Sequence, residues 1–304
     1  MLDFNRNGGV FRSDIVLSGA SGESVTLHLD EGGTSLLRSR LCRSFFKTTS
    51  KESLLERVEK ASDVAELEKI AEKYYLCDVC ELDGVNLYGA KKIFAVVIDV
   101  LYKYPMLRSQ LCYIGSSVGY EKEIEALCKG DLEVLKRFGM QYLCDKDTAM
   151  ALGRLTRSDM RSFDAADAAV AMAFNVFGFF DAIIIDDASF RDYGYIKTAN
   201  DVRYSERVGF HPRGCVGVES VVYHEIGHML DYTCKVTSSP EFSSYYNSIH
   251  ASEIKEGLSE YALSSPAEFF AEAVAEYFCS PTPREISKNC IKILDELYEK
   301  RIKL

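Results

Sequence analysis

The sequence predicts an α+β fold, in which a small mixed sheet packs on one central helix and the C-terminal half is mostly helical. The short apolar run at 111–115 predicts a strand, and the run at 181–186, which has polar ends, is typical of a buried strand. Two or three helices are expected between residues 121 and 177, and helical spacing dominates from residue 216 onward. The two patterns together indicate helices packed on a small sheet.

The N-terminal part of the chain differs from the rest. Apolar segments at 15–17 and 25–30 flank a Gly- and Ser-rich stretch, which predicts a β-hairpin. Helical spacing follows at 62–75 and again at 90–104, where Pro105 ends the helix. We therefore predict an accessory region at residues 1–88, made of a hairpin and then helices, and a main domain at residues 89–304.

Four helices are predicted toward the C-terminus. The third of them has a well-defined start, because Ser265 is a good N-cap and Pro266 suits the first helical position. Before these helices, residues 208–212 predict an edge strand that ends in a turn. The four helices are expected at residues 216–232, 241–256, 266–279 and 283–304.

Composition limits the classes of partner. The chain has 304 residues, a net charge of −10 and a pI of about 5.2, with 47% hydrophobic and 27% charged residues. This is ordinary for a globular chain with a core, but a nucleic-acid-binding protein needs a basic face for phosphate contacts. No apolar run has the length of a transmembrane helix, so we expect no membrane partner. A protein or peptide is the expected partner.

The N-terminus and the cysteines bear on location. The first nine residues lack the basic and then apolar layout of a secretory signal. The ten cysteines are therefore expected to be reduced thiols, and the chain to be cytoplasmic.

A metal-binding motif lies in the predicted helix at 216–232. His224 and His228 are four residues apart, so two imidazoles project from one helix face and can bind one ion. Glu225 follows the first histidine, where a carboxylate can take a proton from water activated by zinc. The helix is otherwise apolar, and burying these polar groups would be costly unless an ion satisfied them. The expected cofactor is Zn²⁺, and small Gly227 would let another backbone approach closely.

A catalytic zinc site needs a third protein ligand and an open position for water. Three glutamates at four-residue spacing, Glu268, Glu272 and Glu276, follow downstream. Glu268 and Glu272 share a helix face, so one can bind zinc while the other holds the outer nitrogen of a histidine. We assign Glu268 as the ligand and Glu272 as the second-shell carboxylate. Glu268 could instead belong to a capping box with Ser265, and Glu276 is expected to face solvent.

These residues resemble a known family. The segment 223–231, followed by Tyr261 and by the run Glu268-Phe-Phe-Ala-Glu272, is similar to the anthrax lethal-factor-like metallopeptidases, which include the Pro-Pro endopeptidases. The resemblance covers residues 208–278, is weaker back to about residue 90 and is absent before that. It implies a zincin-like metallopeptidase domain at 89–304, with His224, His228 and Glu268 as zinc ligands.

The resemblance also implies roles in catalysis. Glu225 would be the general base and acid, and Tyr261 would donate a hydrogen bond to the oxyanion. From its sequence position alone, Tyr261 could equally be a packing residue between helices. Asp231 is expected in the second shell, where it would orient a ligand histidine or an adjoining loop. The implied activity is zinc-dependent endopeptidase hydrolysis.

Some alternatives stay open at this point. The chain could be a catalytically inert zincin-fold binding or structural protein, for example one associated with a phage or a toxin. It could also be a peptidase that is delivered into another cell. His211 is a less favoured candidate for lining a substrate cleft, and His250 is expected on the surface of a helix. The sequence does not predict the substrate or the oligomeric state.

Overall fold

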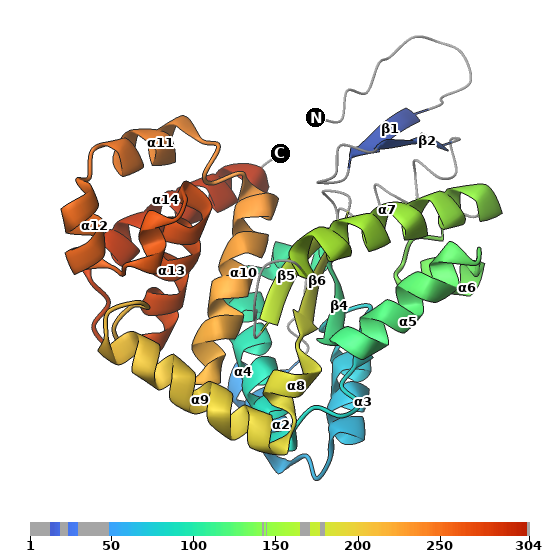
Figure 1. Cartoon of the computed structure of the whole chain (residues 1–304), viewed down its shortest axis with the longest axis horizontal. Coiled ribbons are helices and arrows are strands. Elements are labelled where there is room, and N and C mark those ends of the chain that lie inside the picture. The colour runs from blue at the N-terminus through green and yellow to red at the C-terminus, as the bar shows by residue number, and fades with distance from the viewer. Residues whose placement is uncertain are drawn as a thin grey trace.

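The computed structural model describes residues 13–18, 24–29, 49–141, 143, 145–164, 171–176 and 180–302. Its architecture is α+β: a small sheet is surrounded by helices, and the C-terminal helices form a group on one side of it (Figure 1). In the N-terminal part, the elements are β1 (Ser13–Ser18), β2 (Ser24–Leu29), α2 (Lys51–Lys60), α3 (Val64–Tyr74), β3 (Val79–Glu81), α4 (Leu87–Lys103) and η1 (Pro105–Ser109).

The remaining elements begin with strand β4 of the main sheet. In the middle of the chain they are β4 (Leu111–Ser116), α5 (Ser117–Cys128), α6 (Leu132–Arg137), α7 (Lys146–Asp164), β5 (Ala171–Val176), β6 (Phe180–Ile185), α8 (Asp187–Phe190) and α9 (Asp192–Arg207). The C-terminal elements are α10 (Val218–Cys234), α11 (Pro240–Asn247), α12 (Ala251–Gly257), η2 (Tyr261–Leu263), α13 (Pro266–Cys279) and α14 (Glu285–Ile302).

The main sheet is mixed, as predicted. Its strand order is β3-β4-β6-β5, with β3, β4 and β6 parallel and β5 antiparallel to β6. The predicted strands at 111–115 and 181–186 correspond to β4 and β6. The sequence did not indicate β3 and β5, and residues 171–176 were expected to be helical. Both strands are short, and pairing with a neighbouring strand decides the state of such segments more than local propensity does.

Two cores lie on opposite sides of the sheet. The larger one contains the buried faces of α4, α10, α13 and α14 together with Ile114, Ile183 and Ile185. The smaller one lies under α5, α6 and α7 and includes Tyr113, Ala182 and Ile184. Successive strand residues point to opposite faces, so Ile183, Ile184 and Ile185 divide between the two cores. The sheet therefore supports α10 from one side.

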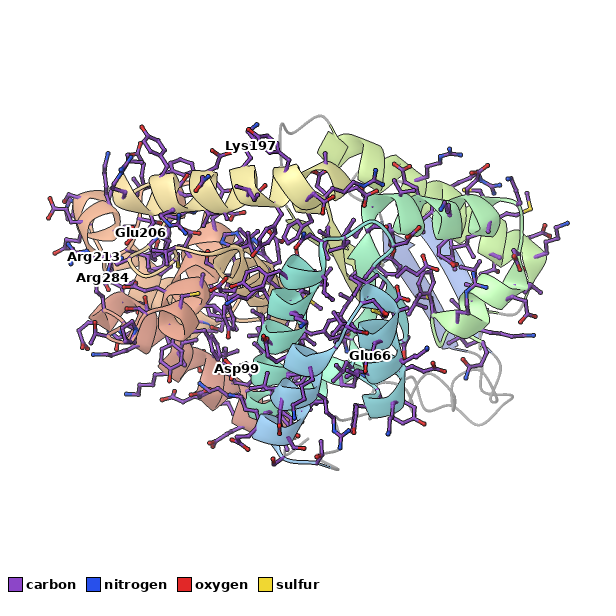
Figure 2. The ribbon with its side chains drawn as sticks, turned by 90° about the horizontal axis from the view of Figure 1, so that it is seen from below. Glu66, Asp99, Lys197, Glu206, Arg213 and Arg284 are labelled. Atoms are coloured by element: carbon purple, nitrogen blue, oxygen red, sulfur yellow. The ribbon has the colours of Figure 1, made fainter. Side chains whose placement is uncertain are left out.

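The predicted boundary between residues 88 and 89 falls inside α4. Asp99 lies on α4 (Figure 2). It accepts a hydrogen bond from Tyr223 of α10 at 2.8 Å and forms an ion pair with Lys51 of α2. Leu54 of α2 and Leu67 of α3 belong to the same core as α10. The described helices α2 and α3 thus pack on α4, which in turn packs on α10, the helix that carries the histidine motif. An accessory role for residues 1–88 stays a prediction.

The predicted edge strand at 208–212 is wrong. Helix α9 continues to Arg207, and the chain then turns at Gly209, whose φ of +79° is easily adopted only by glycine. The backbone after this turn does form hydrogen bonds, from Glu260 N to Gly209 O and from Tyr261 N to Phe210 O. It therefore pairs with the start of η2 instead of with the sheet.

The predicted helix at 241–256 is broken into α11 and α12. Ser248 ends the first helix, and His250 begins the second as its N-cap, with its backbone N–H donating to Glu253 at 2.9 Å. This capping contact satisfies a helix terminus in the middle of the predicted segment. His250 is exposed, as expected.

The other C-terminal helices are confirmed. Helix α13 begins at Pro266, and the Ser265 hydroxyl accepts a hydrogen bond from Glu268 N. Within the described residues, no helix is long and apolar enough to cross a membrane. None of the eight cysteines in the described part of the chain forms a disulfide.

Helices α10 and α13 cross at Gly227, as its small size predicted. A Cβ atom at this position would lie 2.8 Å from Ala271 Cα and 3.3 Å from Val274 Cβ. The nearest atom is backbone, so the two helices would have to separate. Gly227 is therefore the contact that brings the histidine helix close to the glutamate helix.

We expect Gly227→Ala to lower the free energy of unfolding by about 1–2 kcal/mol. Overpacking costs about 1–3 kcal/mol, and the better helix propensity of alanine offsets up to about 1 kcal/mol of it. Urea denaturation measures the change. Gly257→Ala is the control, because its Cβ would meet only the flexible end of Ile286. Equal stability of the Gly227 variant and wild type would show that the helices can separate without cost.

Candidate metal centre

Helix α10 presents two histidines to one point. His224 and His228 lie one turn apart, and their Nε2 atoms are 3.2 Å from each other. Their side chains are 12% and 13% exposed. The remaining faces of the helix are buried in the core through Val222, Ile226 and Met229. Packing therefore fixes the rotation of α10 so that both imidazoles point to the same side.

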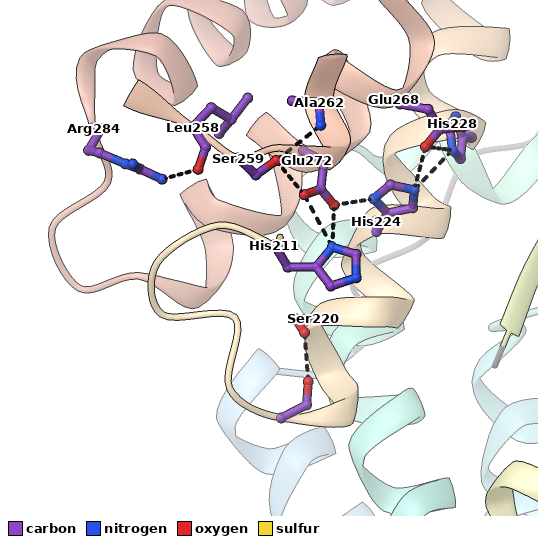
Figure 3. A network of polar contacts seen from close by, with 11 residues as sticks. His211, Ser220, His224, His228, Leu258, Ser259, Ala262, Glu268, Glu272 and Arg284 are labelled. Carbon is purple, nitrogen blue, oxygen red and sulfur yellow. Dashed lines mark hydrogen bonds and ion pairs between the residues drawn. The ribbon is translucent and has the colours of Figure 1, made fainter. Parts of the chain in front are cut away.

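Helix α13 adds a carboxylate to the two imidazoles. Glu268 Oε2 lies 3.0 Å from His224 Nε2 and 3.4 Å from His228 Nε2 (Figure 3). The capping-box alternative holds only in part, because Ser265 caps Glu268 N while the Glu268 carboxylate points to the histidines. One ligand atom from each of His224, His228 and Glu268 lies within 4.8 Å of the others, so this group could hold a metal ion.

The geometry of the three residues fits a zinc ion. Ligand atoms about 2.0–2.2 Å from a tetrahedral zinc lie about 3.3–3.6 Å from one another. The separations here are 3.0, 3.2 and 3.4 Å, close to these values. Glu268 Oε2 is also buried with no hydrogen-bond donor directed at it from the described residues. Two imidazole nitrogens and one carboxylate are a common ligand set for catalytic zinc.

The charges of the site also favour a cation. Burial opposes ionisation of Glu268, but its contacts with His224 and His228 hold the pKa of the carboxyl far below its usual range. Burial likewise opposes a charge on His224, yet its contacts with Glu268 and Glu272 raise its pKa to about 10. The same negative charge that stabilises a proton on His224 would stabilise a metal cation in its place.

Glu272 lies behind the metal site and connects three segments. Its Oε1 accepts a hydrogen bond from His224 Nδ1 at 2.9 Å, and its Oε2 accepts one from Ser259 Oγ at 2.8 Å. His211 Nδ1 lies 3.2 Å and 3.3 Å from the two oxygens (Figure 3). Although burial would raise the pKa of this carboxyl, His211 and His224 lower it to about 2. Glu272 thus holds the outer nitrogen of His224.

Glu225 and Tyr261 are both neighbours of His224. Glu225 is half-buried, and its negative charge acts on both His224 and Tyr261. Tyr261 opens η2, and its ring centroid is 5.9 Å from that of His224. Burial, then the charges of Glu268, Glu225 and Glu272, raise the pKa of Tyr261 to about 12. Its hydroxyl therefore keeps its proton at neutral pH and can act as a donor.

Asp231 contacts a loop and not the cluster. Its two carboxylate oxygens accept hydrogen bonds from Thr237 N at 2.7 Å and from Thr237 Oγ1 at 2.6 Å. Of the two roles expected for this residue, the contacts correspond to orienting the adjoining loop. That loop follows the C-terminus of α10, so Asp231 stabilises the end of the histidine helix.

Sequence reasoning missed two residues of the site. Ser259 is completely buried and joins Glu272 to η2, because its hydroxyl also accepts a hydrogen bond from Ala262 N at 3.1 Å. No local pattern marks it. His211 was a weak candidate, because the sequence of residues 208–212 predicts a strand. The turn signal of Gly209, so close to a histidine and to the metal motif, could have indicated a loop that reaches the site.

Comparisons with known proteins agree with the location of this site. Residues 191–290 match the family model described as anthrax toxin lethal factor, N- and C-terminal domain. Curated proteins and solved structures gave no match. The matched segment contains His224, His228, Glu268 and Glu272. The match therefore supports a relationship of this chain to the lethal-factor-like family over residues 191–290.

Proposed function

We propose that this chain is a zinc-dependent endopeptidase. One observation carries the proposal: the Nε2 atoms of His224 and His228 converge with Glu268 Oε2 at 3.0–3.4 Å. Glu225 directly follows His224 on α10. Such a ligand set, with a carboxylate next to it in the His-Glu-x-x-His spacing, is characteristic of zinc peptidases. The relationship to lethal-factor-like proteins supports the same class of activity.

His224, His228 and Glu268 would hold the ion. A bound zinc ion supplies Lewis acidity, which polarises a peptide carbonyl and lowers the pKa of water. In the proposed reaction Glu225 takes a proton from the attacking water and passes it to the leaving amine. This role suits its position on α10, directly after His224 and not completely buried.

Two further residues have proposed supporting roles. Tyr261 would donate its hydroxyl hydrogen to the oxyanion, since its raised pKa keeps it protonated. Glu272 accepts the Nδ1 hydrogen of His224, which leaves the Nε2 lone pair of that ring for a metal. Carboxylates in this position fix the orientation of a ligand histidine.

Elemental analysis of the purified protein tests the metal site. We expect about one zinc per wild-type chain, and loss of zinc in His224→Ala and in Glu268→Ala. His250→Ala and Glu285→Ala are the controls, because both residues are exposed and outside the cluster. Circular dichroism would establish that the variants remain folded. A wild-type protein that neither contains zinc nor takes it up would contradict the proposal.

Zinc content alone does not establish catalysis. A protein whose zinc content follows this expected pattern, but which cleaves no peptide, would be an inert zincin-like binding protein. Glu225→Gln separates these two functions, because it changes the expected base and leaves the three proposed ligands in place.

A further inference from the structure

We infer that Phe210 and His211 recognise the substrate, a peptide with an apolar side chain next to the cleaved bond. His211 Nε2 would accept a hydrogen bond from a backbone N–H of the peptide, and Phe210 would contact the apolar side chain. This inference rests on the proposed peptidase function and adds to it the class of substrate. Three features of the 209–215 loop support it.

The first feature is the orientation of the His211 ring. Three donors converge on Glu272, namely Ser259 Oγ, His224 Nδ1 and His211 Nδ1, so the carboxylate accepts from all of them. His211 therefore carries a hydrogen on Nδ1, and in the tautomer with this one hydrogen Nε2 presents a lone pair. Figure 3 shows this second nitrogen turned away from Glu272.

The second feature is that Nε2 is available. The His211 side chain is 30% exposed, whereas its partner Glu272 is 2% exposed. Over the described residues, no protein group forms a hydrogen bond with His211 Nε2, although Nδ1 is tied down. A histidine that is fixed on one side and open on the other can bind a ligand without losing much side-chain entropy. A lone pair in this position suits a peptide N–H.

The third feature is an exposed aromatic surface that leads to the metal site. The Tyr261 ring centroid is 5.9 Å from His224, 5.6 Å from His211 and 5.4 Å from Phe210. Phe210 is 41% exposed, and its ring centroid lies 5.0 Å from that of His211, so it forms the solvent side of this aromatic cluster. An apolar side chain of the substrate, next to the peptide bond at the metal site, would cover the exposed Phe210 ring.

The loop is also fixed before any ligand binds. Gly209 O and Phe210 O accept hydrogen bonds from Glu260 N and Tyr261 N, and Gly214 N donates to Glu206 Oε1 of α9 at 3.3 Å. The loop and η2 are thereby joined into one wall. Since Tyr261 belongs to this wall, a peptide held by Phe210 and His211 lies next to the proposed oxyanion donor.

The test uses His211→Asn, which separates substrate contact from positioning. An asparagine amide can still donate to Glu272 in place of Nδ1–H, but it has no group at the position of Nε2. Peptide affinity is measured in a Glu225→Gln background against a randomised library of short synthetic peptides. The values of kcat/KM and zinc content are measured in the otherwise native chain. We expect about 10-fold weaker affinity and about 10-fold lower kcat/KM, with unchanged zinc content.

Phe210→Ala tests the apolar contact. We expect this variant to lose the preference for an apolar residue beside the cleaved bond. The control Tyr204→Ala, which removes an exposed aromatic side chain of α9, should keep it. Unchanged affinity in His211→Asn, or a fall in zinc content alone, would overturn the inference. A wild-type protein that binds zinc and peptides but cleaves none would instead overturn the proposed activity, so the two failures are distinguishable.

Discussion

Replacing Glu225 with glutamine is expected to reduce peptide hydrolysis by about a thousandfold while the protein keeps its zinc. Glutamine has nearly the same shape as glutamate but cannot take a proton from water. The three proposed ligands are His224, His228 and Glu268, and this change alters none of them. The loss should therefore appear in kcat, and metal content should stay at the wild-type value.

The measurement compares single-turnover cleavage of a library-selected peptide by the two proteins, with zinc determined on the same samples. Glu219→Gln is a matched control, since Glu219 lies on the first turn of α10 and outside the cluster. Wild-type rates in the Glu225 variant would rule out this residue as the base. Parallel loss of zinc and rate would indicate instead that Glu225 supports metal binding.

The second large effect is expected at Glu276, where the structure overturns a prediction. Glu276 was expected to face solvent, but its side chain is completely buried. Arg284 Nε donates to its Oε1 at 2.7 Å, and Ser287 donates to its Oε2. Helix α14 covers this face of α13, which the sequence of α13 alone could not indicate.

We expect Glu276→Ala to lower the free energy of unfolding by about 3 kcal/mol. Removing one partner of a buried ion pair costs about 3–5 kcal/mol, because the other charge is left without compensation. The lower end applies, since Arg284 is 23% exposed and also donates to Glu256 O and Leu258 O. Figure 2 shows Arg284 at the end of the C-terminal helix group.

Urea denaturation monitored by circular dichroism gives this value. The control is Glu285→Ala, which removes a 79% exposed glutamate and should change stability by less than about 0.5 kcal/mol. If Glu276→Ala were as stable as the control, the ion pair would contribute nothing. Arg284 also donates to Leu258 O, and the next residue, Ser259, contacts Glu272. Loss of the ion pair should therefore also destabilise the neighbouring η2.

The sequence by itself determined the local features of this protein. Helical spacing and the Ser265 cap define α10 and α13, because the hydrogen bonds that form a helix join residues close in the chain. The spacing of His224 and His228 placed both on one face for the same reason. The small size of Gly227 even indicated that another backbone would come close, which is where Ala271 packs.

Only the tertiary structure decided how distant segments meet. Where Glu268 and Glu272 lie relative to the histidines depends on how α13 crosses α10, and the burial of Glu276 depends on α14. The roles of His211 and Ser259 arise because loops far apart in the sequence meet at one carboxylate. Contacts of this kind depend on packing between elements, which no pattern within a single segment encodes.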